Sequence, residues 1–226
     1  MNNVKSTKRK SNIKLNLQIL FWLFFFGSII GFVFEGVWQI FKKGQWENHS
    51  ATILGPFCII YGIAAMILYA ISSPLKNKNI FLLFLIFAIS GSALEFLASL
   101  FQELVFGSVS WNYKKQFLNI GGRVSLKMTV VWGLLGVLFI KIFYPLFILL
   151  FSKMQGTVWT FACVILTVFM VANLLLTSVA VLRWGERVKD ASPASNIVEE
   201  FFDEHYDNDK MSYIFTNMKF LETSES

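Results

Sequence analysis

Five long apolar runs dominate this sequence and limit it to one class of fold. They lie near residues 17–41, 52–72, 80–104, 126–151 and 157–182. A helix needs about 20 apolar residues to cross the hydrocarbon of a bilayer. Helices also satisfy their own backbone hydrogen bonds, which lipid requires. The alternating segments of about ten residues that build a membrane β-barrel are absent from the sequence. The runs therefore predict an all-α, polytopic transmembrane helical bundle of about five spans.

Charge divides the chain into three predicted parts. Residues 1–16 form a basic head, residues 17–182 form the transmembrane domain, and residues 183–226 form a polar tail that holds ten of the fourteen acids. The tail is predicted to be disordered or to form a short interfacial helix near Phe201–Leu221. The basic head suits an anionic cytoplasmic membrane surface better than a nucleic acid. We expect a multi-pass protein of the bacterial inner membrane with a cytoplasmic N-terminus, although Lys114, Lys115 and Arg183 argue against that orientation.

Two glutamates lie inside the apolar runs, each four residues after a glycine. Gly31 precedes Glu35, and Gly91 precedes Glu95, with 60 residues between the two pairs. A carboxylate at mid-depth costs about 2.5–3.5 kcal/mol on insertion scales, so it needs a partner or a function. Tyr61-Gly62 in the second run similarly resembles Trp132-Gly133 in the fourth. These matches indicate either an internal duplication, with two parallel helical hairpins plus one helix, or a chance similarity.

Other polar residues extend the candidate site. Helical spacing places Ser99 and Glu103 near the face that carries Glu95, and Arg123 and Lys127 are the predicted counter-charges. Lys141 could snorkel or form an ion pair, and Asn173 could join helices. The alternative is that both glutamates only hold helices together. The candidate substrate- or ion-binding residues are Glu35, Glu95, Ser99, Glu103, Arg123, Lys141 and Asn173.

Motifs for catalysis and for cofactors are missing from the sequence. There is no G-x-x-x-x-G-K-[ST] phosphate loop, no H-E-x-x-H and no G-x-S-x-G. Cys58 and Cys163 lie in apolar runs, and His49 and His205 stand alone, so no zinc spacing occurs. We expect a protein that is not an enzyme and that has no cofactor and no metal site.

Four stretches carry a family resemblance. They are FGSIIGFVFEGVWQIF, LGPFCIIYG, the block Leu94–Leu126, and Trp132-Gly133 followed by Pro145. Together they resemble the Putative ABC-transporter type IV family, small bacterial membrane proteins described as permeases. The chain departs from the family pattern at Ile59, where the family tends to have proline, at Asn112 in place of aspartate, and at Asn173 in place of an acid. The resemblance implies a permease-like subunit that works with a separate ATPase; loss of the acid at Asn173 would matter if that acid coupled transport to an ion.

Three hypotheses about function follow. The preferred one is a permease-type component in which Glu35, Glu95 and Arg123 line a polar site between the hairpins. The second is a membrane scaffold or regulator whose acidic tail binds a soluble partner. The third is a membrane enzyme that acts on lipid headgroups through a Glu/Arg pair. Five spans are few for a complete pathway, so a homodimer is also expected.

Overall fold

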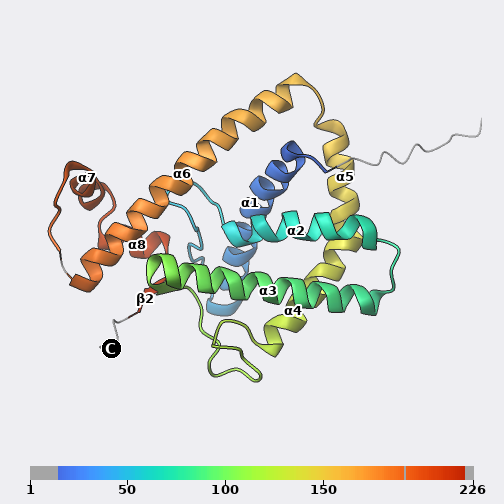
Figure 1. The fold of residues 1–226 in the computed structure, drawn as a ribbon, viewed down its shortest axis with the longest axis horizontal. Coiled ribbons are helices and arrows are strands. Elements are labelled where there is room, and N and C mark those ends of the chain that lie inside the picture. Colours follow the sequence, from blue (N-terminus) through green and yellow to red (C-terminus); the bar gives the residue numbers. More distant parts are fainter. Residues whose placement is uncertain (1–14, 191, 222–226) are drawn as a thin grey trace, which may run out of the picture.

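The computed structural model describes residues 15–190 and 192–221, and they form an almost entirely helical protein (Figure 1). In order, its elements are α1 (Leu17–Lys43), α2 (Ile59–Leu75), α3 (Ile80–Phe106), β1 (Ser108–Val109), α4 (Leu126–Leu138), the π-helix η1 (Phe139–Phe143), α5 (Tyr144–Lys153), α6 (Thr157–Asp190), α7 (Ile197–His205), α8 (Asn208–Ile214) and β2 (Lys219–Phe220). Within the described residues, four helices are long and apolar enough to cross a bilayer: α1, α3, the continuous α4–η1–α5 and α6. The predicted all-α membrane fold is therefore confirmed.

Helices α1 and α3 are built alike. Each has 27 residues, begins after an asparagine cap and ends at a glycine in the left-handed conformation. Asn16 accepts a hydrogen bond from the Ile19 amide, and Asn79 accepts one from the Leu82 amide. Gly44 and Gly107 have φ angles of 77° and 56°, which favour glycine because it lacks a Cβ atom. Local sequence thus sets both ends of both helices.

Glycines hold the helices together in two hairpins, α1 with α2 and α3 with α4. A Cβ atom at Gly27 would lie 2.7 Å from Cβ of Ala65, so α1 and α2 approach closely there. In the second hairpin the glycine is on the other helix, and a Cβ atom at Gly136 would lie 2.1 Å from Cβ of Phe87. Small residues permit such contacts between membrane helices, where burial from water gives no driving force.

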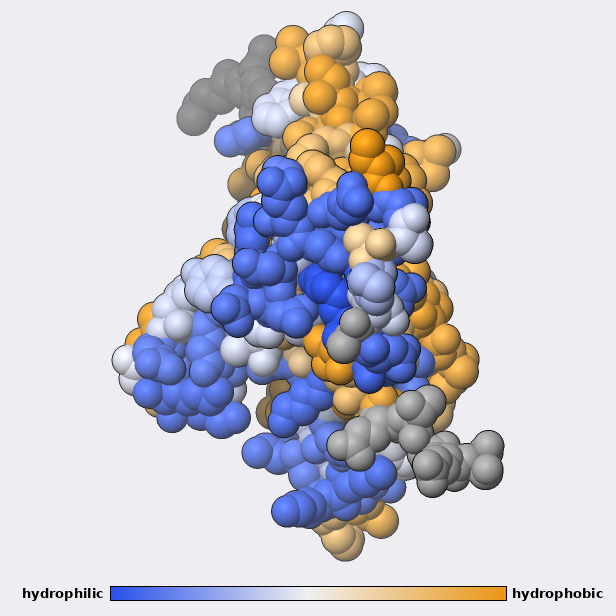
Figure 2. Space-filling view, turned by 90° about the vertical axis from the view of Figure 1, so that its left-hand side faces the viewer, coloured by the Kyte–Doolittle hydropathy of each residue, from blue (hydrophilic) through white to orange (hydrophobic). Residues whose placement is uncertain are grey.

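The helix bundle has two ends, and polar residues gather at one of them. Trp22 near the start of α1 packs against Trp159 near the start of α6, with ring centroids 5.7 Å apart. At the other end, which we call the polar end, the loops 44–58 and 107–125 lie near α8 and β2, and α7 packs beside the end of α6. Hydrophilic residues cover much of this side, and apolar surface dominates above it (Figure 2).

An aromatic core fills the region away from the polar end. It contains Trp22 of α1, Tyr69 of α2, Phe87 of α3 and Phe151 of α5, all buried. Tyr69 packs against Tyr144 at a centroid distance of 5.0 Å. The many phenylalanines of the sequence therefore supply contacts between helices as well as surface toward lipid.

The second apolar run differs from its prediction, because only its later part is helical. We expected a span from Thr52 to Ser72, but α2 begins at Ile59 and residues 50–58 are irregular. Gly55 takes a φ angle of 81°, and Pro56 lacks the amide that a helix interior needs. Irregular backbone among membrane helices is tolerated only where protein or a water-filled cavity covers it.

The predicted acidic tail is largely folded within the described residues. Helix α6 continues to Asp190, and α7 and α8 pack Phe202, Met211 and Phe215 against Trp184. The Arg183 guanidinium, 3% exposed, donates hydrogen bonds of 2.9 and 2.6 Å to the Asp203 carboxylate. β2 pairs with β1, and the Leu221 amide donates to the Gly107 carbonyl. Composition alone did not predict this fold, because the segment is mostly polar. A few apolar side chains and the buried Arg183 fix it against α6.

We predict that Gly136→Ala weakens the second hairpin. The added methyl group would meet Cβ of Phe87, close to the backbone of α3, so the helices must separate. The expected loss is about 1–3 kcal/mol of stability, measured as a lower melting temperature in detergent micelles. Leu134→Ala on the exposed face of the same helix is the control and should have a smaller effect. An unchanged melting temperature for Gly136→Ala would contradict the close packing.

We also predict that the C-terminal contact depends on pH. Hydrogen bonds from Arg183, supported by Arg187, hold the pKa of Asp203 below its usual value. A folded-state pKa below the unfolded one gives stability above the unfolded pKa, which is lost as pH falls through the folded pKa. Asp203→Asn should therefore lower the melting temperature at pH 7, and its difference from the wild type should narrow below about pH 4. Glu200→Gln, an exposed control, should show no such trend; a constant difference for Asp203→Asn would refute the linkage.

Candidate functional site

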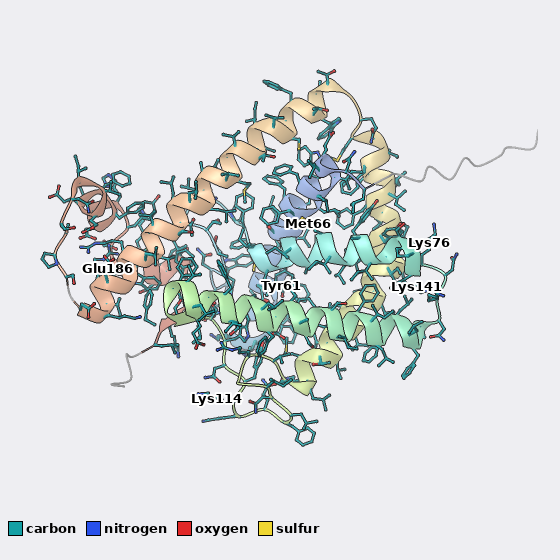
Figure 3. All side chains as sticks on the ribbon, in the orientation of Figure 1. Tyr61, Met66, Lys76, Lys114, Lys141 and Glu186 are labelled. Atoms are coloured by element: carbon teal, nitrogen blue, oxygen red, sulfur yellow. The ribbon has the colours of Figure 1, made fainter. Side chains whose placement is uncertain are left out.

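The first glutamate meets a tyrosine across the first hairpin. Tyr61 of α2 donates a hydrogen bond from its hydroxyl to Oε1 of Glu35 on α1. One turn earlier, a Cβ atom at Gly31 would lie 2.3 Å from Cγ of Tyr61. Glycine at this position therefore makes room for the aromatic ring that serves the carboxylate. Tyr61 lies among the helices near the centre of the view in Figure 3.

The second glutamate is held in the same way. Trp132 of α4 donates from Nε1 to Oε2 of Glu95 at 3.1 Å, and a Cβ atom at Gly91 would lie 2.5 Å from Cγ of Trp132. Tyr113, in the loop between α3 and α4, donates from its hydroxyl to Oε1 at 2.9 Å. Glu95 is only 4% exposed, so these two donors replace water around its carboxylate.

The contacts within the two hairpins repeat at fixed spacings, one for the first helix of each hairpin and one for the second, and this supports the internal duplication. Glu35 and Glu95 are 60 residues apart, and their partners Tyr61 and Trp132 are 71 apart. The same two offsets relate the Gly27–Ala65 contact to the Phe87–Gly136 contact and the Phe24–Gly62 contact to the Phe84–Gly133 contact. Three contacts between helices thus share one register, as an internal duplication predicts.

The two halves meet around a cavity of about 170 Å³, which we call the inter-hairpin cavity. Tyr61 and Trp132 both line it, so the aromatic partners of the two glutamates share one space. Burial, followed by the charge and hydrogen bond of Glu95 and then the charge of Glu35, raises the pKa of Tyr113 well above its usual value. Because Tyr61 and Trp132 line one cavity, the structure brings the aromatic partners of the two predicted glutamates into one region.

The halves differ in how completely each carboxylate is bonded. Glu95 uses both oxygens, whereas Glu35 uses only Oε1 in its hydrogen bond with Tyr61. Among the residues that the structure describes, neither carboxylate has a lysine or arginine nitrogen within 4.0 Å. Glu35 is the more open of the two.

The predicted pairing of Arg123 with these glutamates is wrong in this structure. Arg123 forms an ion pair with Glu103 at 2.7 Å and donates to Ser99 at 3.3 Å. The left-handed turn at Gly121 and Gly122 precedes it, and its guanidinium also lies over the Phe96 ring at 5.9 Å. Three predicted site residues, Ser99, Glu103 and Arg123, thus form a separate cluster toward the C-terminal end of α3.

Lys141 lies apart from both clusters. It is exposed within η1, where the α4–α5 helix widens to π geometry before Pro145. A π segment accommodates proline within a continuous helix, because the proline removes one backbone donor. The predicted snorkelling of Lys141 remains compatible with its exposure; the structure places it outside the glutamate site.

The side chain of Asn173 binds the backbone of the irregular segment 50–58, and not another helix as predicted. Fully buried in the middle of α6, it donates from Nδ2 to the Leu54 carbonyl at 2.7 Å and accepts from the Leu54 amide at 3.2 Å. Thr177, one turn later, accepts from the Ile53 amide at 3.0 Å. These bonds satisfy the irregular segment 50–58 where it enters the helix bundle. Asparagine suits this position because one side chain both donates and accepts.

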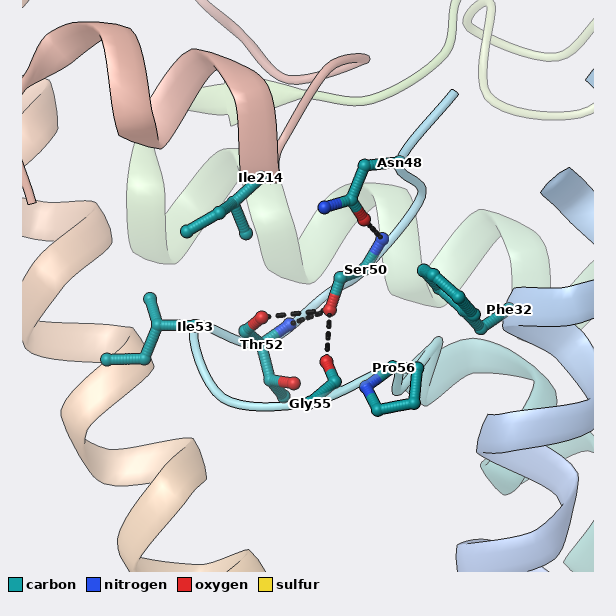
Figure 4. A pocket seen from close by; sticks show the side chains of 8 residues that line it. All are labelled: Phe32, Asn48, Ser50, Thr52, Ile53, Gly55, Pro56 and Ile214. Atoms are coloured by element: carbon teal, nitrogen blue, oxygen red, sulfur yellow. Dashed lines mark hydrogen bonds between the residues drawn. The ribbon is translucent and has the colours of Figure 1, made fainter. Parts of the chain in front are cut away.

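A second cavity, of about 230 Å³, lies beside this segment at the polar end (Figure 4). Asn48, Ser50 and Thr52 line it, together with Ile214 of α8. The Ser50 hydroxyl donates toward the carbonyls of Thr52 and Gly55, and the Thr52 hydroxyl donates to the Leu54 carbonyl. The loop therefore uses its hydroxyl groups to hold its own shape.

Sequence reasoning treated Tyr61 and Trp132 as equivalent residues of a repeat, and it missed both of them, and Tyr113, as partners of the glutamates. A signal was present for the first two. Each is followed by glycine, and the pairs Tyr61-Gly62 and Trp132-Gly133 stand in equivalent runs. Nothing in the sequence indicated that Tyr113 would return from a loop to Glu95.

A family comparison agrees with this architecture. The sequence model of the family described as Putative ABC-transporter type IV matches residues 22–178, a range that contains both hairpins and Asn173. The chain belongs to this family. No curated protein and no solved structure matches the chain. Membership agrees with the resemblance found in the sequence and supports a transporter-like membrane protein.

We predict that Asn173 contributes to stability through the Leu54 backbone. Asn173→Leu should lower stability by about 1–3 kcal/mol, because the Leu54 amide loses its acceptor and the Leu54 carbonyl keeps only the Thr52 hydroxyl as a donor. Asn173→Asp should also destabilise, since a carboxylate cannot donate to the Leu54 carbonyl. Melting temperatures in detergent would measure both effects. Ser178→Ala, which removes a hydroxyl bonded within its own helix, is the control; equal effects at the two positions would count against the clamp.

Proposed function

We propose that the protein is a permease-like subunit that moves a small solute through the junction of its two hairpins. The observation that supports this most is the repeated glutamate–aromatic contact around one cavity. Many carriers place their site where two structural repeats meet, near mid-membrane, and move the repeats against each other. Intramembrane carboxylates commonly mark such pathways.

The residue roles follow from how each carboxylate is bonded. Glu35 has an oxygen free of protein hydrogen bonds and is the proposed solute- or ion-binding group. Glu95 is held by Tyr113 and Trp132 and is proposed to set the distance between α3 and α4. The Arg123–Glu103 pair would position the loop after α3. Asn173, in place of an acid, would hold the irregular segment 50–58.

An ATPase partner and a location complete the proposal. Family membership fits a permease that works with a separate ATPase. We propose the bacterial inner membrane, with the N-terminus cytoplasmic and the polar end on the opposite side. Labelling of a cysteine placed at exposed Ser195 from only one side of sealed vesicles would establish this orientation.

We predict that an ATPase with a phosphate-loop motif co-purifies with the chain in mild detergent, detectable by mass spectrometry. Glu35→Gln should then lower ATP turnover of the reconstituted complex at least about tenfold, with little change in melting temperature. Glutamine still accepts a hydrogen bond from Tyr61 but removes the negative charge, so folding is preserved. Leu97→Ala, on the exposed face of α3, should leave turnover unchanged. Purification of the chain alone, or normal turnover in Glu35→Gln, would contradict the proposal.

The scaffold hypothesis needs a different test from simple truncation. The tail packs on Trp184 and Val181 through α7 and α8, so removing residues after Lys189 would expose an apolar surface and disturb the fold. Substitution of exposed acids such as Glu200 and Glu204 avoids this problem. Loss of a soluble partner after those changes, with no ATPase recovered, would favour the scaffold.

The third hypothesis was an enzyme that acts on lipid headgroups through a Glu/Arg pair. The pair that exists in the structure joins Arg123 to Glu103, away from the contacts of Glu35 and Glu95 with their aromatic partners. No observation favours this alternative over transport.

A further inference from the structure

One row of residues on α1 changes from small to polar along the inter-hairpin region. Gly27, Gly31, Glu35 and Gln39 follow one another at intervals of four, the spacing that forms a ridge on a helix. Gly27 and Gly31 line the inter-hairpin cavity. Glu35 and Gln39 continue the row with a carboxylate and an amide. A ligand along this row would therefore meet apolar surface first and polar acceptors next.

The cavity itself is apolar and small. Its walls are Ile30 and Phe34 of α1, Ala64 of α2, Leu138 of α4 and Phe143 of η1, with the rings of Tyr61 and Trp132. Its volume of about 170 Å³ is comparable to the engineered cavity of about 150 Å³ that stays dry and binds benzene. A short alkyl or aryl group fits this space, and a pair of lipid acyl chains does not.

The polar part of the row holds two oxygen atoms that accept no hydrogen bond from the described residues. One is the Glu35 oxygen outside the hydrogen bond with Tyr61, on a half-buried side chain. The other is Oε1 of Gln39, which is 7% exposed. A buried acceptor without a partner, such as Gln39 Oε1, is uncommon and costly. A group that carries both positive charge and N–H donors would satisfy the two acceptors together.

The second half of the molecule shows the corresponding arrangement with its own cation. The offset that relates Glu35 to Glu95 relates Gln39 to Ser99, and Ser99 accepts from the Arg123 guanidinium. By the offset of 71 residues that relates Tyr61 to Trp132, Arg123 corresponds to Thr52. The first half therefore keeps the polar side chains on the first helix and has threonine where the second half has arginine.

We propose that the first half binds a primary ammonium ion with a small apolar substituent. The ammonium would donate to Glu35 and Gln39, and the substituent would occupy the inter-hairpin cavity. The Tyr61 ring adds attraction for a cation near its face. The inference rests on the proposed transport function, because it names the class of solute that the same site would carry.

Binding to the purified full chain in an uncharged maltoside detergent tests this proposal. The probe is n-hexylammonium, compared with n-hexanol and n-hexyl sulfate, and binding is measured by calorimetry and by native mass spectrometry. One hexylammonium should bind per chain, at least about tenfold more tightly than hexanol, with no binding of hexyl sulfate. Glu35→Gln and Gln39→Leu should each weaken binding, Glu35→Gln by about tenfold or more. Glu200→Gln is the folded control with unchanged affinity.

A competition experiment distinguishes a lipid headgroup from a free amine as the source of the ammonium group, and other outcomes would contradict the proposal. Competition by phosphatidylethanolamine in nanodiscs would identify a lipid headgroup as the source, and its absence would identify a free amine. Equal binding of hexanol and hexylammonium, displacement by sodium or potassium ions alone, or unchanged affinity in Glu35→Gln would overturn the proposal. This test needs no ATPase, so failure to bind amines would leave the permease proposal intact, whereas failure to find an ATPase would not affect the binding result.

Discussion

The structure depends on a ring packed against a glycine one turn before a glutamate. A carboxylate within apolar helices is unstable unless a donor reaches it, and the donors here are the tyrosine hydroxyl and the indole N–H of neighbouring helices. Each ring can reach its carboxylate only because Gly31 or Gly91 leaves the required space. The same contact therefore joins the helices of each hairpin and offsets the free-energy cost of placing the carboxylate among apolar helices. One aromatic residue thus serves both the packing and the hydrogen bonding.

The two hairpins share this contact but differ in the groups around it. In the second half the polar groups have partners: Glu95 accepts from two donors, and Arg123 donates to Ser99 and forms an ion pair with Glu103. The first half is more open, with one donor on Glu35 and an unpartnered acceptor on Gln39. The proposed carrier role would use this difference, with the more fully bonded half as the frame and the less fully bonded half as the binding side.

Sequence reasoning identified the helices and the two glutamates, because apolar length and the cost of buried charge are local properties. It also identified Tyr61-Gly62 and Trp132-Gly133 as equivalent. It failed where distant contacts decide the conformation. The start of α2 depends on Gly55 and Pro56 and on bonds from α6 to residues 53 and 54. The partner of Arg123 depends on the turn before it, and the folded tail depends on the buried Arg183. In each case the deciding group is more than 15 residues away in the chain or lies in a loop.

Asn173 shows how one residue links these features. It lies 16 residues into α6, about 24 Å from the helix start at 1.5 Å per residue. At that position it binds the backbone of Leu54, so the irregular segment 50–58 enters the helix bundle and α2 begins there. Because the irregular segment ends at Cys58, α2 begins at Ile59 and Tyr61 lies in its first turn, opposite Glu35. Had α2 begun at Thr52, the Leu54 carbonyl would accept from the amide of residue 58 within the helix and would not need the side-chain amide of Asn173. The broken segment, its clamp and the position of Tyr61 opposite Glu35 thus form one arrangement.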